Sequence, residues 1–261
     1  MPALGYGVWQ VPDDEAEAAV AEALRVGYRS IDTAAIYGNE RGTGRAIAHS
    51  DVPRDEIFLT TKLWNADQGR DEALRAFDAS LERLGVEAID LYLIHWPVPS
   101  ADRYVETWRT LADIAASGRA RAIGVSNFLP EHLDRLVEET GVVPALNQVE
   151  FHPLFQPHEI QAACDRLGIV TEAWSPLGSG TALQDATIAS IAASVGRSPA
   201  QVILRWHLDR GRVVIPKTVT PSRIAENFDV FDFALTDEQL AAIDGLASAD
   251  GRTGPDPAVF G

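Results

Sequence analysis

The chain has 261 residues, a hydrophobic fraction of 46% and a formal net charge of −16. This hydrophobic fraction can fill a sizeable core, and a field of this sign repels nucleic acids and anionic membranes. The one cysteine, Cys164, excludes a disulfide within the chain, and its place in QAACDRLG predicts a small buried side chain. Neither a charged leader before an apolar stretch nor a run of about 18 apolar residues is present. We therefore expect a cytoplasmic monomer with no nucleic-acid or membrane partner.

Short stretches rich in β-branched and aromatic residues recur along the chain. They predict eight strands, at residues 28–32, 57–62, 89–95, 121–126, 146–151, 169–174, 213–217 and 230–233. Between them lie amphipathic stretches such as DDEAEAAVAEALRVG and RDEALRAFDASLERLG, which begin with acids and end at glycine. Acids in the first turn and glycine after the last turn are typical of helices.

The alternation of strands and helices predicts the fold class. The connections are too long for hairpins, so we expect parallel strands. Eight of them in a chain of this length indicate an α/β fold in which residues 1–261 form a single (β/α)8 TIM barrel. An open doubly wound sheet is the alternative, but it normally carries G-x-G-x-x-G after an early strand when it binds a dinucleotide. The segment RGTGRAI lacks the third glycine and follows a loop.

The predicted strands end in residues that can do chemistry. Active sites of (β/α)8 barrels lie at the carboxyl ends of the strands. Seven successive strand ends carry polar or hydrogen-bonding side chains, namely Asp32, Lys62, His95, Ser126 with Asn127, Gln148, Trp174 with Ser175, and Lys217 with Thr218. One polar strand end means little, because loops begin there, but seven in succession predict a site at one mouth of the barrel.

Four side chains near this mouth suit the reduction of a carbonyl group. Asp32 and Lys62, on adjacent strands, are expected to pair and to keep the ammonium charged. Tyr37 follows Asp32 on the rising loop, and a neighbouring cation is expected to lower the pKa of its phenol from about 10. Tyr37 then gives a proton to the carbonyl oxygen, and a neutral His95 donates a second hydrogen bond to it. No serine or cysteine stands beside a histidine as an activated nucleophile.

A series of longer motifs resembles the aldo-keto reductase family. Between residues 5 and 233 they are GYGVWQV, RSIDTAAIYGNE, LTTKLWN, DLYLIHWP, GVSNF, NQVEFHP, AWSPLG and VVIPKTVTPSRIAENFDVFDF. In detail the chain is most similar to the bacterial 2,5-diketo-gluconate reductase group, which shares its GRTGPDP-like tail. The resemblance implies an enzyme that reduces aldehydes or ketones with NADPH. Its catalytic tetrad would be Asp32, Tyr37, Lys62 and His95, with Tyr37 as the proton donor.

The resemblance also implies which positions hold the cofactor. Ser126, Asn127 and Gln148 match residues that bind the nicotinamide carboxamide, and Trp174 matches an aromatic ring that stacks on the nicotinamide. The other matched positions are Ser175, Leu177 and Gly178 for the pyrophosphate, Lys217, Thr218 and Arg223 for the 2′-phosphate, and Glu226 and Asn227 for the adenine. Two cations and a hydroxyl on one loop suit a phosphomonoester and so favour NADPH over NADH. A carboxylate that binds the ribose hydroxyl would be typical of NAD.

Some features depart from the family pattern. We expect the short β-hairpin that usually plugs the bottom of the barrel to be largely absent, either lost or removed by the choice of start site, and the short tail after the last helix predicts an open substrate pocket. Trp9, Trp64 and Trp96 either line that pocket together with His95 or are ordinary hydrophobic rim residues. The histidines show no H-E-x-x-H spacing, so no metal site is expected.

Other functions are compatible with a barrel that carries lysine and histidine at its strand ends. Isomerases and hydrolases of this fold use similar residues. A non-catalytic nicotinamide-binding module that senses redox state is a further alternative. Within the reductase interpretation, the substrate stays open between small α-dicarbonyls such as methylglyoxal and keto-sugar acids such as 2,5-diketo-gluconate.

Overall fold

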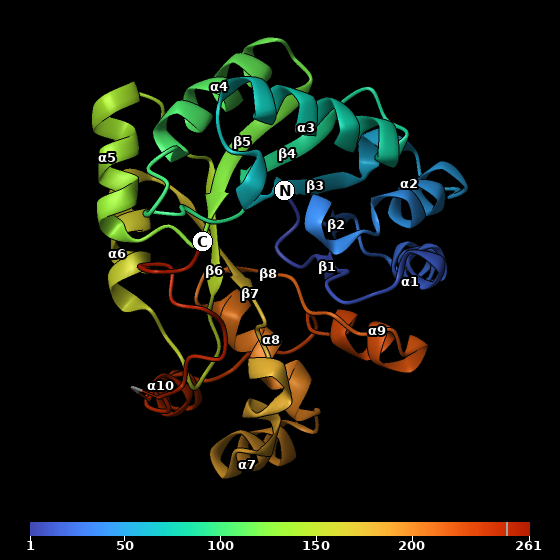
Figure 1. The fold of residues 1–261 in the computed structure, drawn as a ribbon. Coiled ribbons are helices and arrows are strands. Elements are labelled where there is room, and N and C mark those ends of the chain that lie inside the picture. Colours follow the sequence, from blue (N-terminus) through green and yellow to red (C-terminus); the bar gives the residue numbers. More distant parts are fainter. Residues whose placement is uncertain (249) are drawn as a thin grey trace.

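Eight parallel strands form the centre of the computed structural model, which describes residues 1–248 and 250–261. In chain order they are β1 (Tyr6–Gly7), β2 (Ser30–Asp32), β3 (Phe58–Leu63), β4 (Ile89–Ile94), β5 (Ala120–Ser126), β6 (Leu146–Glu150), β7 (Val170–Trp174) and β8 (Val213–Val214). Each strand pairs with the next, and a parallel bridge from Leu4 to Val214 joins the first strand segment to the last. The sheet closes on itself, which confirms the predicted (β/α)8 barrel (Figure 1).

Helices surround these strands (Figure 1). The α-helices are α1 (Asp13–Val26), α2 (Glu40–Ala48), α3 (Arg70–Leu84), α4 (Tyr104–Ala116), α5 (Pro130–Thr140), α6 (His158–Leu167), α7 (Ala186–Val195), α8 (Pro199–Asp209), α9 (Pro221–Phe228) and α10 (Asp237–Asp244). The 3₁₀ turns are η1 (Ala35–Tyr37), η2 (Arg54–Glu56), η3 (Asn65–Asp67), η4 (Gly178–Gly180) and η5 (Ala182–Gln184). In α3, Asp71 and Glu72 lie in the first turn, where the helix dipole favours negative charge, and Gly85 ends the helix with a left-handed φ of 67°.

Eight strands were predicted and eight are observed, but the two sets differ at both ends of the chain. One strand was missed near the N-terminus, and one was predicted near the C-terminus where none forms. The structure has an extra strand, β1, whose two residues are too few to show a period in the sequence. Residues 230–233, predicted as a strand, form none. Arg205 of α8 donates to the Val230 carbonyl at 3.2 Å, and Phe231 is 55% exposed. This apolar segment packs beside a helix instead of completing the sheet.

The two-residue period of a strand decides which side chains face the barrel interior. In β4, Leu91 and Leu93 form a separate inner cluster, whereas Tyr92 packs on Phe77 of α3, with ring centroids 4.9 Å apart. His95 follows Leu93 by two residues and continues the inward row just beyond the strand. An imidazole therefore ends an apolar run because that run points it into the barrel mouth.

The outer core lies between the strands and the helices. Trp108 of α4 and Trp206 of α8 are its largest fully buried side chains. Cys164 of α6 is also buried, which confirms the prediction from the sequence. Across residues 1–248 and 250–261, no helix combines the length and the apolar character needed to cross a bilayer.

Candidate active site

The inward rows bring polar side chains to the carboxyl ends of the strands. Asp32 ends β2, Lys62 lies near the end of β3, Ser126 ends β5 and Gln148 lies in β6, while His95 directly follows β4. Each of these residues is at most 8% exposed. Because the strands are parallel, these ends meet at one mouth of the barrel.

Asp32, Tyr37, Lys62 and His95 lie together at this mouth. The Lys62 Nζ is fully buried and donates hydrogen bonds to Asp32 Oδ1 at 2.5 Å and to the Thr33 carbonyl at 2.9 Å. The same nitrogen lies 5.1 Å from the centre of the Tyr37 ring. The Tyr37 and His95 rings meet edge to face, with centroids 5.6 Å apart. A carboxylate, an ammonium, a phenol and an imidazole therefore form one cluster.

The Tyr37 phenol is held in its protonated state. Burial is the largest influence and raises its pKa above the ordinary value of 10, and the Asp32 charge acts in the same direction. Lys62 acts in the opposite direction and lowers the pKa. The prediction of a lowered pKa was therefore right for the influence of Lys62 and wrong for the net result, because desolvation of the phenolate outweighs the cation.

Lys62 and His95 respond differently to the same burial. Burial favours a neutral amine at Lys62, but the charge of Asp32 and the hydrogen bond to it outweigh burial and raise the pKa. At His95, burial and then the Lys62 charge lower the pKa well below the ordinary 6.5. At neutral pH the site therefore holds a charged ammonium beside a neutral imidazole, which can donate one hydrogen bond.

A cleft of about 540 Å³ opens beside this cluster, a volume usual for small-molecule sites. Its lining contains Asp32, Tyr37 and His95 together with Ser126, Asn127, Gln148, Trp174, Ser175 and Lys217. Gln10, Asn127, Ser175 and Ser179 of this lining have φ between 47° and 64°. Such strained conformations of residues other than glycine cluster at functional sites.

Hydrogen bonds order the inner wall of the cleft. Ser126 Oγ donates to the Gln148 carbonyl at 2.8 Å. Asn127 Nδ2 donates to Ser126 Oγ and to the His95 carbonyl, both at 3.0 Å. Trp174 Nε1 donates to Asn127 Oδ1 at 2.8 Å. The positions expected to hold a nicotinamide group are thus linked to one another and to His95.

The remaining expected cofactor positions lie farther out. Leu177 and Gly178 lie at the start of η4, and Gly178 is buried with a φ of 58°. Lys217 and Thr218 follow β8, and the structure places Arg223, Glu226 and Asn227 on α9. Lys217 reaches the cleft, whereas the three α9 residues lie outside its lining. Lys217 and Arg223 are exposed, and neither forms an ion pair within the described ranges.

Three tryptophans stand around the cleft. Trp9, Trp64 and Trp96 all belong to its lining. The Trp64 ring meets His95 edge to face, with centroids 5.3 Å apart. Trp96 is 7% exposed, whereas Trp9 is 49% exposed. Trp64 and Trp96 therefore form the inner walls, and Trp9 stands at the rim.

The C-terminal tail, residues 250–261, reaches the mouth of the barrel. Glu150, at the end of β6, accepts hydrogen bonds from Thr253 N at 2.6 Å, from Thr253 Oγ1 at 2.7 Å and from Gly254 N at 2.9 Å. A side chain on Gly254 would lie 2.4 Å from the Trp174 ring, so this close approach requires glycine. The short tail is thus anchored beside the cleft and forms part of its lining, a contact that the sequence did not predict.

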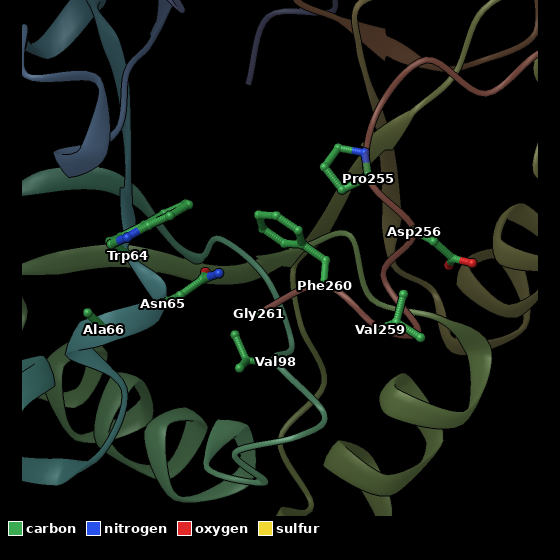
Figure 2. Close-up of a pocket in the computed structure, with 9 residues that line it drawn as sticks. All are labelled: Trp64, Asn65, Ala66, Val98, Pro255, Asp256, Val259, Phe260 and Gly261. Atoms are coloured by element: carbon green, nitrogen blue, oxygen red, sulfur yellow. The ribbon is translucent and has the colours of Figure 1, made fainter.

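Phe260 of the tail stands between the cleft and a second, apolar hollow of about 720 Å³. Trp64, Pro255 and Phe260 line both spaces. Figure 2 shows the Phe260 ring pointing from the tail toward the space in front of Trp64. Phe260 also packs on Trp96, with ring centroids 4.5 Å apart. The tail thus supplies one wall of the cleft.

Two buried carboxyl groups at this site, Glu150 and Glu172, did not emerge from the sequence analysis. Glu172 lies in β7 and is 1% exposed, and its Oε2 accepts a hydrogen bond from Gln148 Nε2 at 2.7 Å. Burial, and then the Asp32 charge, raise its pKa to about 8. The strand period could have found both groups, since Glu172 precedes Trp174 by two residues and Glu150 follows Gln148 by two.

Known proteins match this chain over nearly its whole length. A model of the aldo/keto reductase family matches residues 3–248. The methylglyoxal reductase DkgA of Escherichia coli K12 is 50% identical over 100% of this chain and 94% of its own. A solved Gox0644 variant in complex with NADPH is 49% identical, with a TM-score of 0.96 over 100% of this chain and 95% of that one. A protein provisionally named 2,5-diketo-D-gluconic acid reductase B is 36% identical, with a TM-score of 0.95 over 98% and 91%. These matches confirm the resemblance, and the chain belongs to the aldo/keto reductase family.

Proposed function

We propose that this chain uses NADPH to reduce small aldehydes and ketones to alcohols. The observation that carries the proposal is the cluster of Asp32, Tyr37, Lys62 and His95 beside a cleft of about 540 Å³. Family membership weighs against an isomerase, a hydrolase or a redox-sensing module. We extend the proposal to a single domain over residues 1–261 and to a cytoplasmic monomer, since a net charge of −16 favours solubility and opposes self-association.

The side chains around the cleft fit a nicotinamide cofactor with a 2′-phosphate. The indole of Trp174 offers an aromatic face, and Asn127 and Gln148 offer amides for the carboxamide group. Lys217 and Arg223 are exposed cations outside any ion pair of the described residues, and they suit a phosphate. The donor set therefore supports NADPH binding, with the phosphate end on the loop after β8 and on α9.

The chain's own residues would handle the proton. Bound NADPH supplies the hydride to the carbonyl carbon. Tyr37, protonated because it is buried, donates its proton to the carbonyl oxygen as that oxygen becomes negative. Lys62, 5.1 Å from the ring, stabilises the phenolate that remains, and Asp32 holds Lys62 in place. Neutral His95 donates a hydrogen bond to the same oxygen.

We further propose that small α-dicarbonyls such as methylglyoxal are preferred over keto-sugar acids. The walls beside His95 are formed by Trp64, Trp96 and Phe260. Among the described residues of the cleft lining, Lys217 is the only lysine or arginine, and we assign it to the cofactor. A carboxylate substrate would thus be buried without a counter-ion, which is costly. The methylglyoxal reductase activity in the name of the DkgA relative agrees with this preference.

Replacement of Tyr37 by phenylalanine tests the mechanism. We expect turnover of methylglyoxal to fall about 10²–10⁴-fold, the usual contribution of a general acid. NADPH should still quench the tryptophan fluorescence of the variant, because the phenol oxygen is not part of the expected cofactor contacts. The loss of NADPH absorbance with a panel of carbonyl compounds measures turnover.

Three outcomes would count against separate parts of the proposal. Near-normal turnover in the Tyr37→Phe variant would remove Tyr37 as the proton donor. A wild-type protein that oxidises NADPH with none of the carbonyls would contradict the reductase function. A higher kcat/KM for 2,5-diketo-gluconate than for methylglyoxal would overturn the substrate preference alone.

A further inference from the structure

Glu172 is a buried carboxyl group outside the proposed catalytic cluster. It lies opposite Gln148 in the register of β6 and β7 and is 1% exposed. Its Oε2 accepts a hydrogen bond from Gln148 Nε2 at 2.7 Å. Its Oε1 is buried and has no hydrogen-bond partner among residues 1–248 and 250–261. Burying a carboxyl group is costly, and here only one of its two oxygens is hydrogen-bonded, so we looked for a function that would explain its presence.

The amide of Gln148 is held from both sides. Its Nε2 also donates to Asp32 Oδ2 at 2.8 Å, while the other oxygen of Asp32 binds Lys62. A side-chain amide has two N–H donors, and here one binds Asp32 and the other binds Glu172. The amide is thereby fixed in one orientation, with its carbonyl oxygen on the side away from the two carboxyl groups. Gln148 lines the cleft, so this oxygen is the acceptor that it can offer to a ligand.

We propose that Glu172 is a positioning residue: by accepting the second amide hydrogen of Gln148, it holds the Gln148 carbonyl oxygen toward the cleft to receive the carboxamide NH₂ of the cofactor. The inference rests on the proposed function. Without Glu172, one N–H of Gln148 loses its acceptor and the amide is held by Asp32 alone. The amide can then rotate, and a rotated amide would present N–H groups to the NH₂ of the cofactor, where donor meets donor.

The charge state of Glu172 agrees with this role. The charged and polar groups that face it are Asp32 from β2, Lys62 from β3 and Gln148 from β6, and its neighbour on β8 is the apolar Val213. Burial keeps its pKa at about 8, so the neutral acid prevails at pH 7. A neutral Glu172 accepts the bond from Gln148 without adding a second negative charge beside the Asp32–Lys62 pair. A neutral amide at this position can do the same.

The experiment compares Glu172→Met, which fills the space but offers no oxygen acceptor, with Glu172→Gln, which keeps one. Thr171→Val is the matched control, because Thr171 precedes Glu172 in the same strand and its side chain contacts Cys164 of α6, on the side away from the barrel interior. Two quantities are measured: the Kd of NADP⁺ from tryptophan fluorescence, and the transfer of deuterium from NADPH labelled on one or the other face of the nicotinamide ring. We expect Glu172→Met to raise the Kd about 10-fold, the effect of one strong hydrogen bond, and to reduce the selectivity between the faces. Glu172→Gln and Thr171→Val should stay within about threefold of wild type in Kd and keep the selectivity, since both leave an acceptor for the Gln148 amide.

Several results would overturn the inference. An unchanged Kd and an unchanged face selectivity in Glu172→Met would show that Gln148 needs no second anchor. Equal losses in Glu172→Gln would show that the carboxyl group itself is required, and equal losses in Thr171→Val would show a general weakening of β7. Should Glu172→Met fail to fold, Glu172→Asn, one methylene too short to reach Gln148, is expected to behave in the same way. Failure of the wild-type enzyme to oxidise NADPH would instead contradict the proposed function.

Discussion

The two ends of the proposed cofactor site are built differently. At the barrel mouth, Asp32, Lys62 and Gln148 are at most 4% exposed and are hydrogen-bonded to one another. On the loop after β8 and on α9, Lys217 and Arg223 are exposed and make no ion pair in the part of the chain that the structure describes. The residues of the inner end are held in place by hydrogen bonds to one another, whereas the cations of the outer end have no partner among the described residues and are available to a ligand.

This difference follows from the cost of burying charge. A buried ion must be paired and hydrogen-bonded, so the groups at the mouth hold one another in place. An exposed cation is stabilised by water, so it needs no partner within the protein and remains free to bind a phosphate, although salt screens the attraction between the two charges. Changes to the Asp32–Lys62 pair should therefore alter turnover, and changes to Lys217 or Arg223 should alter the affinity for the phosphate end of the cofactor.

Replacement of Lys62 by methionine has the largest expected effect. The variant leaves Asp32 buried without its cation and removes the charge that opposes the raised pKa of Tyr37. We expect turnover to fall about 10²–10⁴-fold and the free energy of unfolding to fall by about 3–5 kcal/mol. Steady-state kinetics and urea unfolding measure the two effects, and the Kd of NADPH should change little.

The double variant Asp32→Asn with Lys62→Met is the control for this prediction. It removes both charges of the pair, so stability should recover while turnover stays low. Recovery of turnover together with stability would show that the ammonium serves folding only. The inner end would then differ from the outer end in stability alone and not in its effect on turnover.

Replacement of Arg223 by alanine addresses the outer end. A hydrogen bond to a charged group contributes about 1.5–3 kcal/mol, so the Kd of NADPH should rise about 10–150-fold. The Kd of NADH, which lacks the 2′-phosphate, and turnover at saturating cofactor should both be unaffected. Arg166→Ala is the matched control, since Arg166 is an exposed arginine on α6 that pairs with Asp134. Equal losses for NADPH and NADH would contradict the assignment of Arg223 to the phosphate.

Much of the inner end could be predicted from the sequence because its residues lie where predicted strands end. Asp32, Lys62 and His95 each close an apolar run, and the strand period points all three inward. β1 was missed because two residues show no period. Residues 230–233 were misassigned because an apolar run that packs beside a helix looks the same as a strand.

The remaining features depend on contacts between distant parts of the chain. Gln148 and Glu172 are 24 residues apart, and Glu150 and Thr253 are 103 residues apart. No local pattern reveals such pairs. The direction of the Tyr37 pKa shift likewise needed the extent of burial, because Lys62 alone would lower the pKa and burial reverses the result.

Replacement of Glu172 by glutamine probes the inner end through pH. Its pKa is raised from 4.5 to about 8 in the folded protein, so between these values the folded chain holds a proton that the unfolded chain has lost. The stability that this group contributes is complete below pH 4.5 and declines as pH rises toward 8, by up to about 1.4 kcal/mol per pH unit. Subtracting the free energy of unfolding of the variant from that of wild type, across this window, isolates the slope. Parallel curves would show that Glu172 ionises normally.

Replacement of Glu150 by glutamine has the smallest expected effect. It tests whether the anchored tail belongs to the ordered inner end of the site. Hydrogen bonds from His152, Thr253 and Gly254 outweigh burial and lower the pKa of Glu150, so a carboxylate anchors the tail. Glutamine keeps one acceptor oxygen and places an NH₂ group where the other oxygen of Glu150 accepts, so at least one hydrogen bond of the tail is lost. A loss of about 1 kcal/mol predicts a roughly fivefold higher KM for the carbonyl substrate.

The control for Glu150 is Thr253→Val, which removes only the hydroxyl contact of the tail and should raise KM less. In both variants kcat should stay near wild type, because the tail forms a wall of the cleft and does not touch the Asp32–Lys62 pair. A fall in kcat that exceeds the rise in KM would mean that the anchored tail, through Gly254 against Trp174, also orients the reacting groups. The ordered inner end would then extend from the strand ends to the last residues of the chain, and only the phosphate loop would remain ligand-dependent.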